Sequence, residues 1–503
     1  MADDIMKKIV SISLIGLMIL CCSSTASSKN YYEKNSDQIS IDRCLSTLTN
    51  EQYDYLIITS EDLTDSIYSS SFINWKKQIG FSLKIVTVSD DEITNQNGID
   101  LAEQIRNFLS EYYQTCEVKY VLLIGDIDTI PMRYCYPDPD NHKNYHGNAI
   151  LYDILGGGAY PTDHYYADLS SPDNESWDAD GDGFHGEIGE DNPDMKAEIR
   201  VGRIPTSNPT RVTITLDKIV HFEQDTGAWK QNVLHAGAQM WFPNEIDYHS
   251  WKYYFDYGEI YTHIGLDGAF ILSEMENNFM DKFNITHFSE QSGKIKSKYE
   301  WKSLDKDSFS STWRNGKFGI VNWVAHGYPF GILRKVQVRQ DEDNFSEIIE
   351  RKWEPMLDIF SNLDDDFPSV VYASSCLVGI PEHNLLGNFA IDLLTKPNFG
   401  SAVSIICNTR SPIENPYWPD IPGGSSAMMY TFYRLLINNL KGSCSIGEAL
   451  FTMKSYHLKN ESWAGYWSER YPENANYYLQ IDYRMQYSLN LYGDPSLMIG
   501  GYT

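Results

Sequence analysis

Short apolar runs alternate with amphipathic stretches along most of the chain. Residues 53–60, 81–88 and 118–126 are rich in β-branched and aromatic side chains and have the length of buried strands. Between them, residues 67–79 and 101–113 repeat apolar positions at helical spacing. Strands that alternate with helices and are apolar on both faces predict a parallel sheet covered by helices on both sides. We therefore expect an α/β fold.

The same alternation continues through the second half of the chain. Two of its predicted strands end in reactive side chains: residues 318–325 lead into His326-Gly327, and residues 368–375 lead into Cys376. In open α/β sheets, functional sites form at the carboxyl ends of strands. If these strands are parallel neighbours, the two side chains emerge at the same side of the sheet, where the strands have their carboxyl ends. This side is called the edge of the sheet below. A cysteine beside a histidine is a nucleophile beside a base, which is the minimum that acyl transfer requires.

Each of these residues also has a structural interpretation. A cysteine at a strand end is commonly a small core residue, and a lone His-Gly pair carries little information. His383, seven residues after Cys376, is a rival base, although a position in a loop is expected for it. The ordered pair on consecutive strands is what favours catalysis.

The pattern resembles that of the gingipain-type cysteine peptidases, which have a caspase-like fold. The resemblance covers about residues 53–500 and implies two adjacent parallel-sheet α/β subdomains with helices on both faces. Besides the two strand ends, it rests on three stretches of sequence: Glu198-Ile-Arg-Val-Gly-Arg-Ile-Pro, Gly400-Ser-Ala-Val-Ser-Ile-Ile and Leu491-Tyr-Gly-Asp-Pro-Ser-Leu-Met.

If the site cleaves peptide bonds, each of its residues has a definite task. Cys376 attacks the scissile carbonyl as a thiolate, and His326 carries the proton to the leaving amine. The backbone N–H groups of Gly327 and Cys376 are expected to bind the oxyanion. A carboxylate that orients His326 is left open between Asp163 and Glu187, because the resemblance allows an acidic residue of the first subdomain in this role.

The resemblance also implies two substrate-binding residues. Asp194 matches the acidic residue at the base of a pocket for a basic side chain, which implies cleavage after Arg or Lys. The alternative is that Asp194 makes a turn before the following strand. Trp418 matches a ring that covers the substrate pocket, and the alternative is simple burial of a large ring.

A run of acidic residues lies near the end of the first predicted subdomain. Asp178, Asp180 and Asp182 alternate ahead of Gly183, and Glu187 lies close behind. Calcium loops gather carboxylate oxygens around such a tight turn. Position twelve, where an EF-hand has a glutamate, is a glycine, so this is a calcium-loop-like segment with Asp178, Asp180, Asp182 and Glu187 as candidate ligands. An acidic, solvated loop is the alternative.

Composition narrows the class of partner. The net charge of −29 argues against nucleic acid and anionic membranes as partners, since phosphate binding needs basic patches.

The beginning of the sequence has the form of a signal peptide, because Lys7-Lys8 precede an apolar stretch at 9–20. A lipoprotein signal at Cys21 or Cys22 and a retained anchor helix are the alternatives. The expected organisation is a signal peptide at 1–28, a linker at 29–50, an N-terminal subdomain at 51–190 and a catalytic subdomain at 191–503.

Eight cysteines are present and none forms a Cys-x-x-Cys pair. Outside the signal and apart from Cys376, five cysteines remain, so at most two disulfides can form among them.

We expect a secreted or cell-surface monomeric endopeptidase that acts on proteins or peptides and has no organic cofactor. The alternatives are an acyl transferase that attaches surface proteins and a non-catalytic surface protein. A catalytic Cys376 is expected to have a low pKa and to alkylate quickly near neutral pH.

Overall fold

The computed structural model describes residues 52–139, 158–169, 177–191, 193–243, 265–341, 348–363, 366–382, 387–397, 401–438 and 444–502. The expected signal peptide, the expected linker and His383 lie outside these residues. The chain from Gln52 onward forms one compact unit. Among the described helices, none combines the length and the apolar character needed to cross a bilayer.

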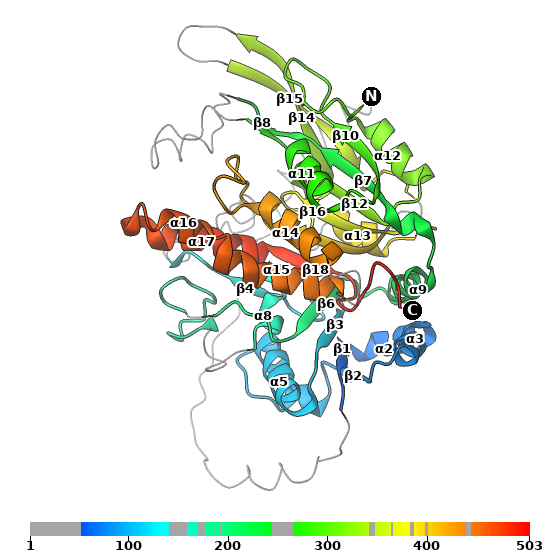
Figure 1. The fold of residues 1–503 in the computed structure, drawn as a ribbon. Coiled ribbons are helices and arrows are strands. Elements are labelled where there is room, and N and C mark those ends of the chain that lie inside the picture. The colour runs from blue at the N-terminus through cyan, green and yellow to red at the C-terminus, as the bar shows by residue number, and fades with distance from the viewer. Residues whose placement is uncertain are drawn as a thin grey trace, which may run out of the picture. The chain divides into compact units, whose positions relative to one another are not determined.

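A sheet of 11 strands runs through the described residues (Figure 1). Its order is β11-β10-β7-β12-β16-β17-β18-β6-β3-β1-β2. The strands are β1 (Tyr55–Thr59), β2 (Leu83–Thr87), β3 (Tyr120–Ile124), β6 (Arg200–Ile204), β7 (Asn232–Gly237), β10 (Asn284–Ser289), β11 (Lys302–Ser303), β12 (Ile320–Val324), β16 (Ser369–Ser374), β17 (Ala402–Asn408) and β18 (Leu489–Tyr492).

The direction of the sheet reverses once. The pairing of β17 with β18 is antiparallel, whereas β18 pairs in parallel with β6 and all other neighbours are parallel. The sheet therefore consists of two parallel halves that lie side by side, run in opposite directions and meet at the β17–β18 pair. The fold is α/β with a mostly parallel sheet, as predicted. The boundary between residues 190 and 191 stays a prediction, and β6, just after it, pairs with β3 of the preceding segment.

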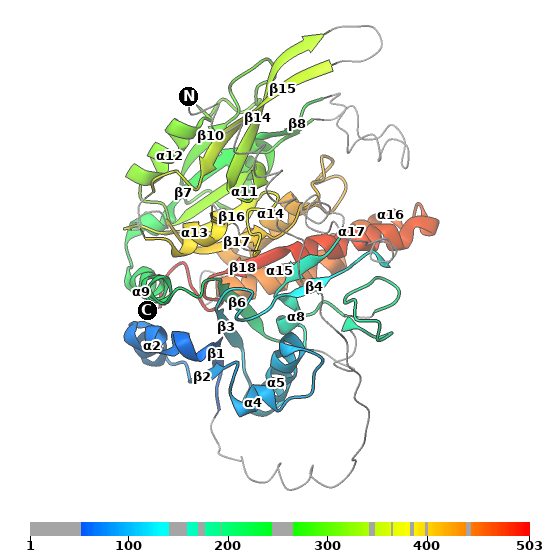
Figure 2. The ribbon, with the colours of Figure 1, turned by 180° about the vertical axis from the view of Figure 1, so that it is seen from behind.

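Helices cover both faces of this sheet. Side chains alternate along each buried strand, so each face is apolar and packs against helices. Ile320 and Val324 point into one core, which also contains residues of α2, α3, α9, α11, α14 and α15. Val321 and Trp323 point into the other face, which α12 and α13 cover, while α5 and α8 cover that face in the other half. Helices α14 and α15 lie in front in Figure 1, and α13 lies in front in Figure 2.

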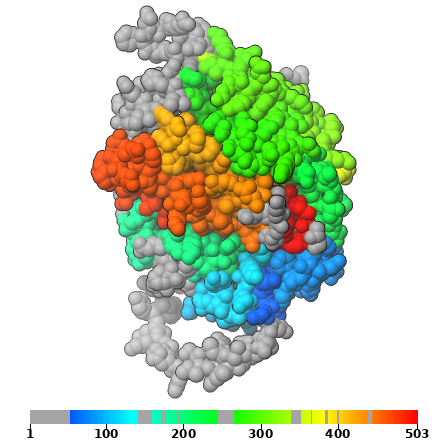
Figure 3. Space-filling model, viewed as in Figure 1, coloured from blue at the N-terminus to red at the C-terminus, as the bar shows by residue number. Residues whose placement is uncertain are grey.

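The helices have the following bounds: α2 (Glu61–Ser69), α3 (Phe72–Gln78), α4 (Asp91–Thr94), α5 (Leu101–Cys116), α8 (His164–Ala167), α9 (Pro209–Gln224), α11 (Ala269–Phe279), α12 (Lys306–Asn315), α13 (Phe389–Thr395), α14 (Ser425–Asn438), α15 (Ile446–Asn460), α16 (Trp463–Trp467) and α17 (Ala475–Ser488), with 3-10 turns η2 (Ala228–Gln231) and η4 (Pro472–Asn474). In the space-filling view, the C-terminal segments in orange and red lie between the N-terminal segments in blue and the middle of the chain in green (Figure 3).

Three small antiparallel sheets lie beside the main one. They pair β4 (Arg133–Cys135) with β5 (Tyr160–Thr162), β8 (Gln239–Trp241) with β9 (Leu266–Asp267), and β13 (His326–Tyr328) with β14 (Gly331–Asp341) and β15 (Ile348–Asp358). The β14–β15 ribbon extends at the top of both ribbon views (Figures 1 and 2). It was not expected from the sequence, and its first strand, β14, follows β13, which starts at His326.

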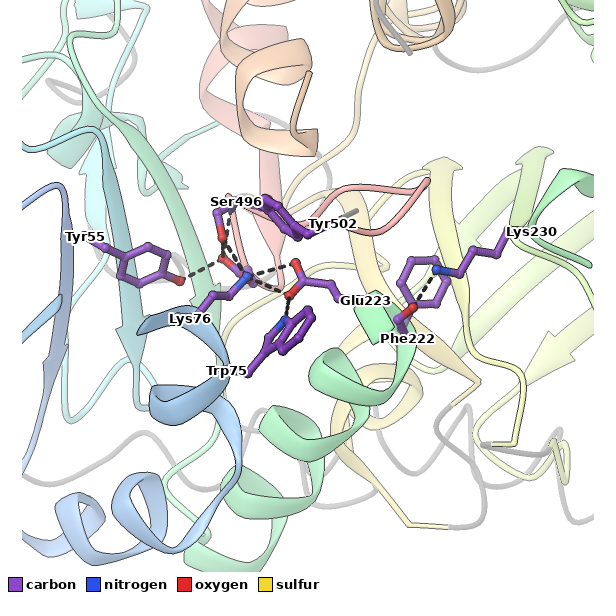
Figure 4. Close-up of polar contacts among 9 residues, drawn as sticks. Tyr55, Trp75, Lys76, Phe222, Glu223, Lys230, Ser496 and Tyr502 are labelled. Atoms are coloured by element: carbon purple, nitrogen blue, oxygen red, sulfur yellow. Dashed lines mark hydrogen bonds and ion pairs between the residues drawn. The ribbon is translucent and has the colours of Figure 1, made fainter. Parts of the chain in front are cut away.

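A buried ion cluster joins the first helices to the end of the chain (Figure 4). Lys76 of α3 forms ion pairs with Glu223 of α9 at 2.8 Å and with Asp494 at 2.6 Å, and all three side chains are fully buried. Tyr55 donates a hydrogen bond to Asp494 at 2.7 Å, and Trp75 donates one to Glu223 at 2.8 Å. Because two carboxylates share one ammonium, the pKa of Lys76 is raised even though burial opposes its charge. The turn Gly493-Asp494-Pro495 is thus held to the first strand and the first helices by charge and hydrogen bonds.

Replacing Lys76 with Met tests this cluster. The change leaves two carboxylates buried without their cation, so the free energy of unfolding should fall by about 3–5 kcal/mol. Urea unfolding of the whole chain measures it. The matched control is Lys77→Met on the exposed face of the same helix, expected to stay within about 0.5 kcal/mol of wild type. Equal stabilities of the two variants would contradict a central role for the cluster.

Candidate active site

The two reactive strand ends are neighbours. β12 and β16 pair in parallel with Val324 opposite Ser374. The Ala325 N–H continues this register by donating to the Ser374 carbonyl at 3.1 Å. His326 and Cys376 each follow two residues after the paired positions. Both therefore leave the same edge of the sheet, as predicted from the sequence.

Gly327 packs directly on the turn that carries the cysteine. A Cβ atom at this glycine would overlap the carbonyl oxygen of Cys376 and would lie 2.8 Å from the Cβ of Ser375 and 2.9 Å from a methyl group of Val378. A side chain at position 327 is therefore excluded by backbone, which cannot move away cheaply. The His-Gly motif and the cysteine turn fit together only with glycine at this position.

His326 is held by two groups that the sequence did not indicate. Its Nε2 lies 3.0 Å from the carbonyl oxygen of Met240, at the β8 strand. Its ring meets that of Trp353 edge to face, with centroids 4.7 Å apart. Because a carbonyl only accepts hydrogen bonds, Nε2 carries the proton in the neutral ring and Nδ1 is left as the basic nitrogen. A backbone carbonyl leaves no signature in a sequence, so Met240 could not have been found there.

The two carboxylates considered for orienting His326 lie in other surroundings. Both oxygens of Asp163 accept hydrogen bonds from Arg203 of β6, each at 2.7 Å, in a buried ion pair. Glu187 belongs to the acidic loop. The Nε2 atom of His326 lies against the Met240 carbonyl instead.

Cys376 lies on a sharp turn. The next residue, Leu377, has a φ of +62°, a conformation that a side chain with a Cβ rarely adopts. The turn is fixed to the end of β17, because the Gly379 N–H donates to the Asn408 carbonyl at 3.0 Å. Backbone strain of this kind is typical of positions where a reactive side chain is held out of the regular structure.

The sulfur of Cys376 is a free thiol, and so are the sulfurs of the other described cysteines, Cys116, Cys135, Cys407 and Cys444. Burial raises the pKa of the Cys376 thiol to about 11, and the Glu414 carboxylate adds to this, whereas a hydrogen bond with Ser411 opposes it. This differs from the low pKa expected of a preformed thiolate. Near neutral pH the resting sulfur is protonated, so a base must remove the proton during the reaction.

The two expected substrate-binding residues occupy different surroundings. Asp194 is exposed, and its carboxylate accepts a hydrogen bond from the Lys196 N–H at 2.8 Å, which is the turn offered as its alternative role. Since β18 is antiparallel to β17 and parallel to β6, the start of β6 lies at the edge where β16 and β17 end. Asp194, shortly before β6, therefore reaches the same edge as Cys376. Trp418 is partly buried, with ring centroids 4.9 Å from Tyr430 and 6.1 Å from Phe270.

The acidic loop brings its carboxylates together. Asp178, Asp180 and Asp191 have ligand oxygens within 4.8 Å of one another, and so do Asp180, Glu187 and Glu190. Asp182, which the sequence also suggested, accepts a hydrogen bond from the Phe184 N–H at 2.8 Å. Extending the acidic run by a few residues would have added Glu190 and Asp191.

Two carboxyl groups of this loop have raised pKa values. Burial and the neighbouring carboxylates raise the pKa of Glu187 to about 8, and burial raises that of Asp191 to about 6. Two glycines with positive φ, Gly181 and Gly183, allow the tight bend that gathers the acids. Hard oxygen ligands around one turn are the donor set that calcium prefers.

A mostly parallel sheet with a cysteine and a histidine at one edge defines the caspase-like class of cysteine peptidase fold. The chain belongs to peptidase family C25, the gingipain family of cysteine peptidases, whose sequence model matches residues 48–500. Peptidases of this family act on proteins or peptides.

Individual relatives are distant. The crystal structure of the Arg-specific cysteine proteinase gingipain R (RgpB) is similar with a TM-score of 0.54 at 13% identity, over 89% of this chain and 78% of that one. The complex of Porphyromonas gingivalis RgpB pro- and mature domains gives a TM-score of 0.50 at 14% identity, over 88% and 79%. An uncharacterized protein of Archaeoglobus fulgidus is 25% identical over 303 residues, which are 55% of this chain and 57% of that protein. These structural likenesses establish the fold.

Gly327→Ala tests the contact between the two motifs. The added methyl group meets the backbone of the cysteine turn, so the free energy of unfolding should fall by about 1–3 kcal/mol. Gly500→Ala is the control, because a Cβ there meets nothing within 4 Å. Wild-type stability of Gly327→Ala in urea unfolding would show that the turn is not packed on the glycine as described.

Proposed function

We propose that this protein is an exported cysteine endopeptidase that uses Cys376 as nucleophile and His326 as general base. The observation that supports the proposal most directly is the parallel pairing of β12 with β16, which brings the two residues to one edge of the sheet. Membership of peptidase family C25 agrees with it.

The high pKa of the thiol determines the order of the proposed steps. When the substrate carbonyl is bound, Nδ1 of His326 takes the proton as the sulfur forms a bond to the carbonyl carbon. The Met240 carbonyl keeps the ring in the required tautomer and stabilises the imidazolium. The backbone N–H groups of Gly327 and Cys376 bind the oxyanion. The imidazolium then protonates the leaving amine, and water hydrolyses the thioester.

Cleavage after a basic residue is the specificity we propose. The exposed carboxylate of Asp194 comes shortly before β6, whose start lies at the edge that carries Cys376, and it would pair with a cationic side chain. The partly buried ring of Trp418 follows β17 at this edge and offers an apolar surface to the stem of such a side chain. The net charge of −29 also favours the approach of a basic substrate.

Calcium is the structural cofactor we propose for the acidic loop. Asp178, Asp180 and Asp191 would hold it on one side, and Glu187 and Glu190 on the other. A divalent cation would relieve the repulsion that raises the pKa of Glu187. Its contribution would be to the folding of this loop, because the loop packs through Gly186 on Tyr487, which donates a hydrogen bond to the Gly186 carbonyl at 3.1 Å.

Peptide cleavage tests the enzymatic proposal. On a library of arginine- and lysine-containing peptides, Cys376→Ala and His326→Ala should each lower kcat/KM at least about a thousandfold, because neither nucleophile nor base can be replaced by water. Asp194→Asn should weaken the preference for basic residues before the cut while cleavage of other peptides persists. Mass spectrometry of the products gives both results.

Equal cleavage by wild type and both alanine variants would contradict the proposed dyad. An unchanged preference in Asp194→Asn would remove that residue from the specificity pocket. Products joined to an added amine, in place of hydrolysed ones, would assign the site to acyl transfer. Absence of any turnover by a folded wild-type chain would favour a non-catalytic surface protein.

Calcium binding is tested by thermal unfolding. Calcium at a hundredfold excess over its Kd should stabilise the wild-type chain by about 2.7 kcal/mol, and EDTA should remove the effect. Asp180→Asn, which changes a residue of both carboxylate groups, should abolish the response, whereas the exposed Asp281→Asn outside the loop should keep it. A melting curve that is indifferent to calcium would mean that the loop is only an acidic surface.

A further inference from the structure

The loop between β17 and α14 carries a buried carboxylate close to the nucleophile. One oxygen of Glu414 accepts a hydrogen bond from the Ser374 hydroxyl at 2.8 Å. The other accepts from the N–H and the hydroxyl of Ser426, at 3.0 and 2.7 Å. The Ser374 hydroxyl also lies 3.1 Å from that of Ser425. Glu414 therefore ties the end of β16 to the start of α14.

This tie reaches both reactive strands. Ser374 is the last residue of β16 and comes two residues before Cys376. Its carbonyl accepts a hydrogen bond from the Ala325 N–H, just before His326. A single serine thus links Glu414 to the cysteine turn through its chain and to the histidine strand through its carbonyl. The amino-terminal end of α14, where the Ser426 N–H donates to Glu414, favours a negative charge at this point.

The Glu414 carboxyl group is held by hydrogen bonds. Within the described part of the chain, no lysine, arginine or histidine forms an ion pair with this buried carboxylate, and three hydrogen bonds and the α14 terminus stabilise it instead. Burial raises the pKa of Glu414 itself. When it is ionised, Glu414 adds to burial in disfavouring the Cys376 thiolate.

On these contacts, we propose that Glu414 is a positioning residue of the nucleophile. Its hydrogen bond to Ser374 fixes the turn that carries Cys376, and its carboxylate, when ionised, opposes formation of the thiolate. The inference rests on the proposed function. When the sulfur–carbon bond forms, the thiol proton moves to His326. The proton leaves with the amine, which restores the resting charges.

Two variants separate the charge from the tether. Glu414→Gln removes the charge and keeps the shape, because its oxygen can still accept from Ser426 while its amide donates to the Ser374 hydroxyl. Ser374→Ala removes the tether and keeps the charge. Glu461→Gln is the control, since it neutralises a partly buried glutamate that bonds Thr431 of α14, away from the cysteine.

The readouts are the pH profile of Cys376 alkylation by iodoacetamide, followed peptide by peptide by mass spectrometry, and kcat and KM on a cleaved peptide. Glu414→Gln should shift the alkylation profile about one pH unit lower, which is about tenfold faster labelling near neutral pH. Ser374→Ala should leave the profile in place and lower kcat about tenfold, with KM changed less than about twofold. Glu461→Gln should match wild type in both.

An alkylation profile that does not move in Glu414→Gln would overturn the electrostatic part, and wild-type kcat in Ser374→Ala would overturn the positioning part. If Glu414→Gln does not fold, the kcat of Ser374→Ala decides. Failure of the proposed function is recognised separately, because a wild-type chain without peptidase activity still reports the coupling of Glu414 to Cys376 through alkylation.

Discussion

The parallel pairing of β12 with β16 is the constraint on which the site depends. Its register sets Val324 opposite Ser374. His326 comes two residues after Val324, and Cys376 comes two residues after Ser374. Gly327 then meets the carbonyl of Cys376 so closely that only glycine fits. A shift of one residue in this register would move each side chain to the opposite face. The chemistry of the edge is therefore a consequence of strand pairing.

The rest of the fold holds this edge from two directions. Glu414 and Ser374 connect the cysteine strand to α14, while the Met240 carbonyl and the Trp353 ring hold the histidine from the side of β8 and the β14–β15 ribbon. Farther away, the antiparallel β17–β18 pair joins the two halves of the sheet, and the turn after β18 supplies the buried Asp494 that pairs with Lys76. The end of the chain is thus part of the core that supports the site.

Much of this could be predicted from the sequence. The apolar strands and amphipathic helices indicated the α/β class, and the order of His326 and Cys376 indicated adjacent strand ends. The β14–β15 ribbon could not be predicted, since its partly exposed strands lack the continuous apolar pattern of the buried ones. The Met240 carbonyl is invisible in principle, and Glu414 looked like any loop acid until its three hydrogen bonds were seen. The thiol's high pKa likewise depends on burial, which sequence does not report.

Covalent trapping tests the central claim most directly. A peptidyl chloromethyl ketone with arginine before the reactive group should modify Cys376, as located by the mass of the labelled peptide. Labelling should nearly vanish in His326→Ala, because the protonated thiol then has no base. Labelling spread over Cys116 and Cys444, or labelling of Cys376 at the same rate with and without His326, would contradict a functional cysteine–histidine pair at this edge.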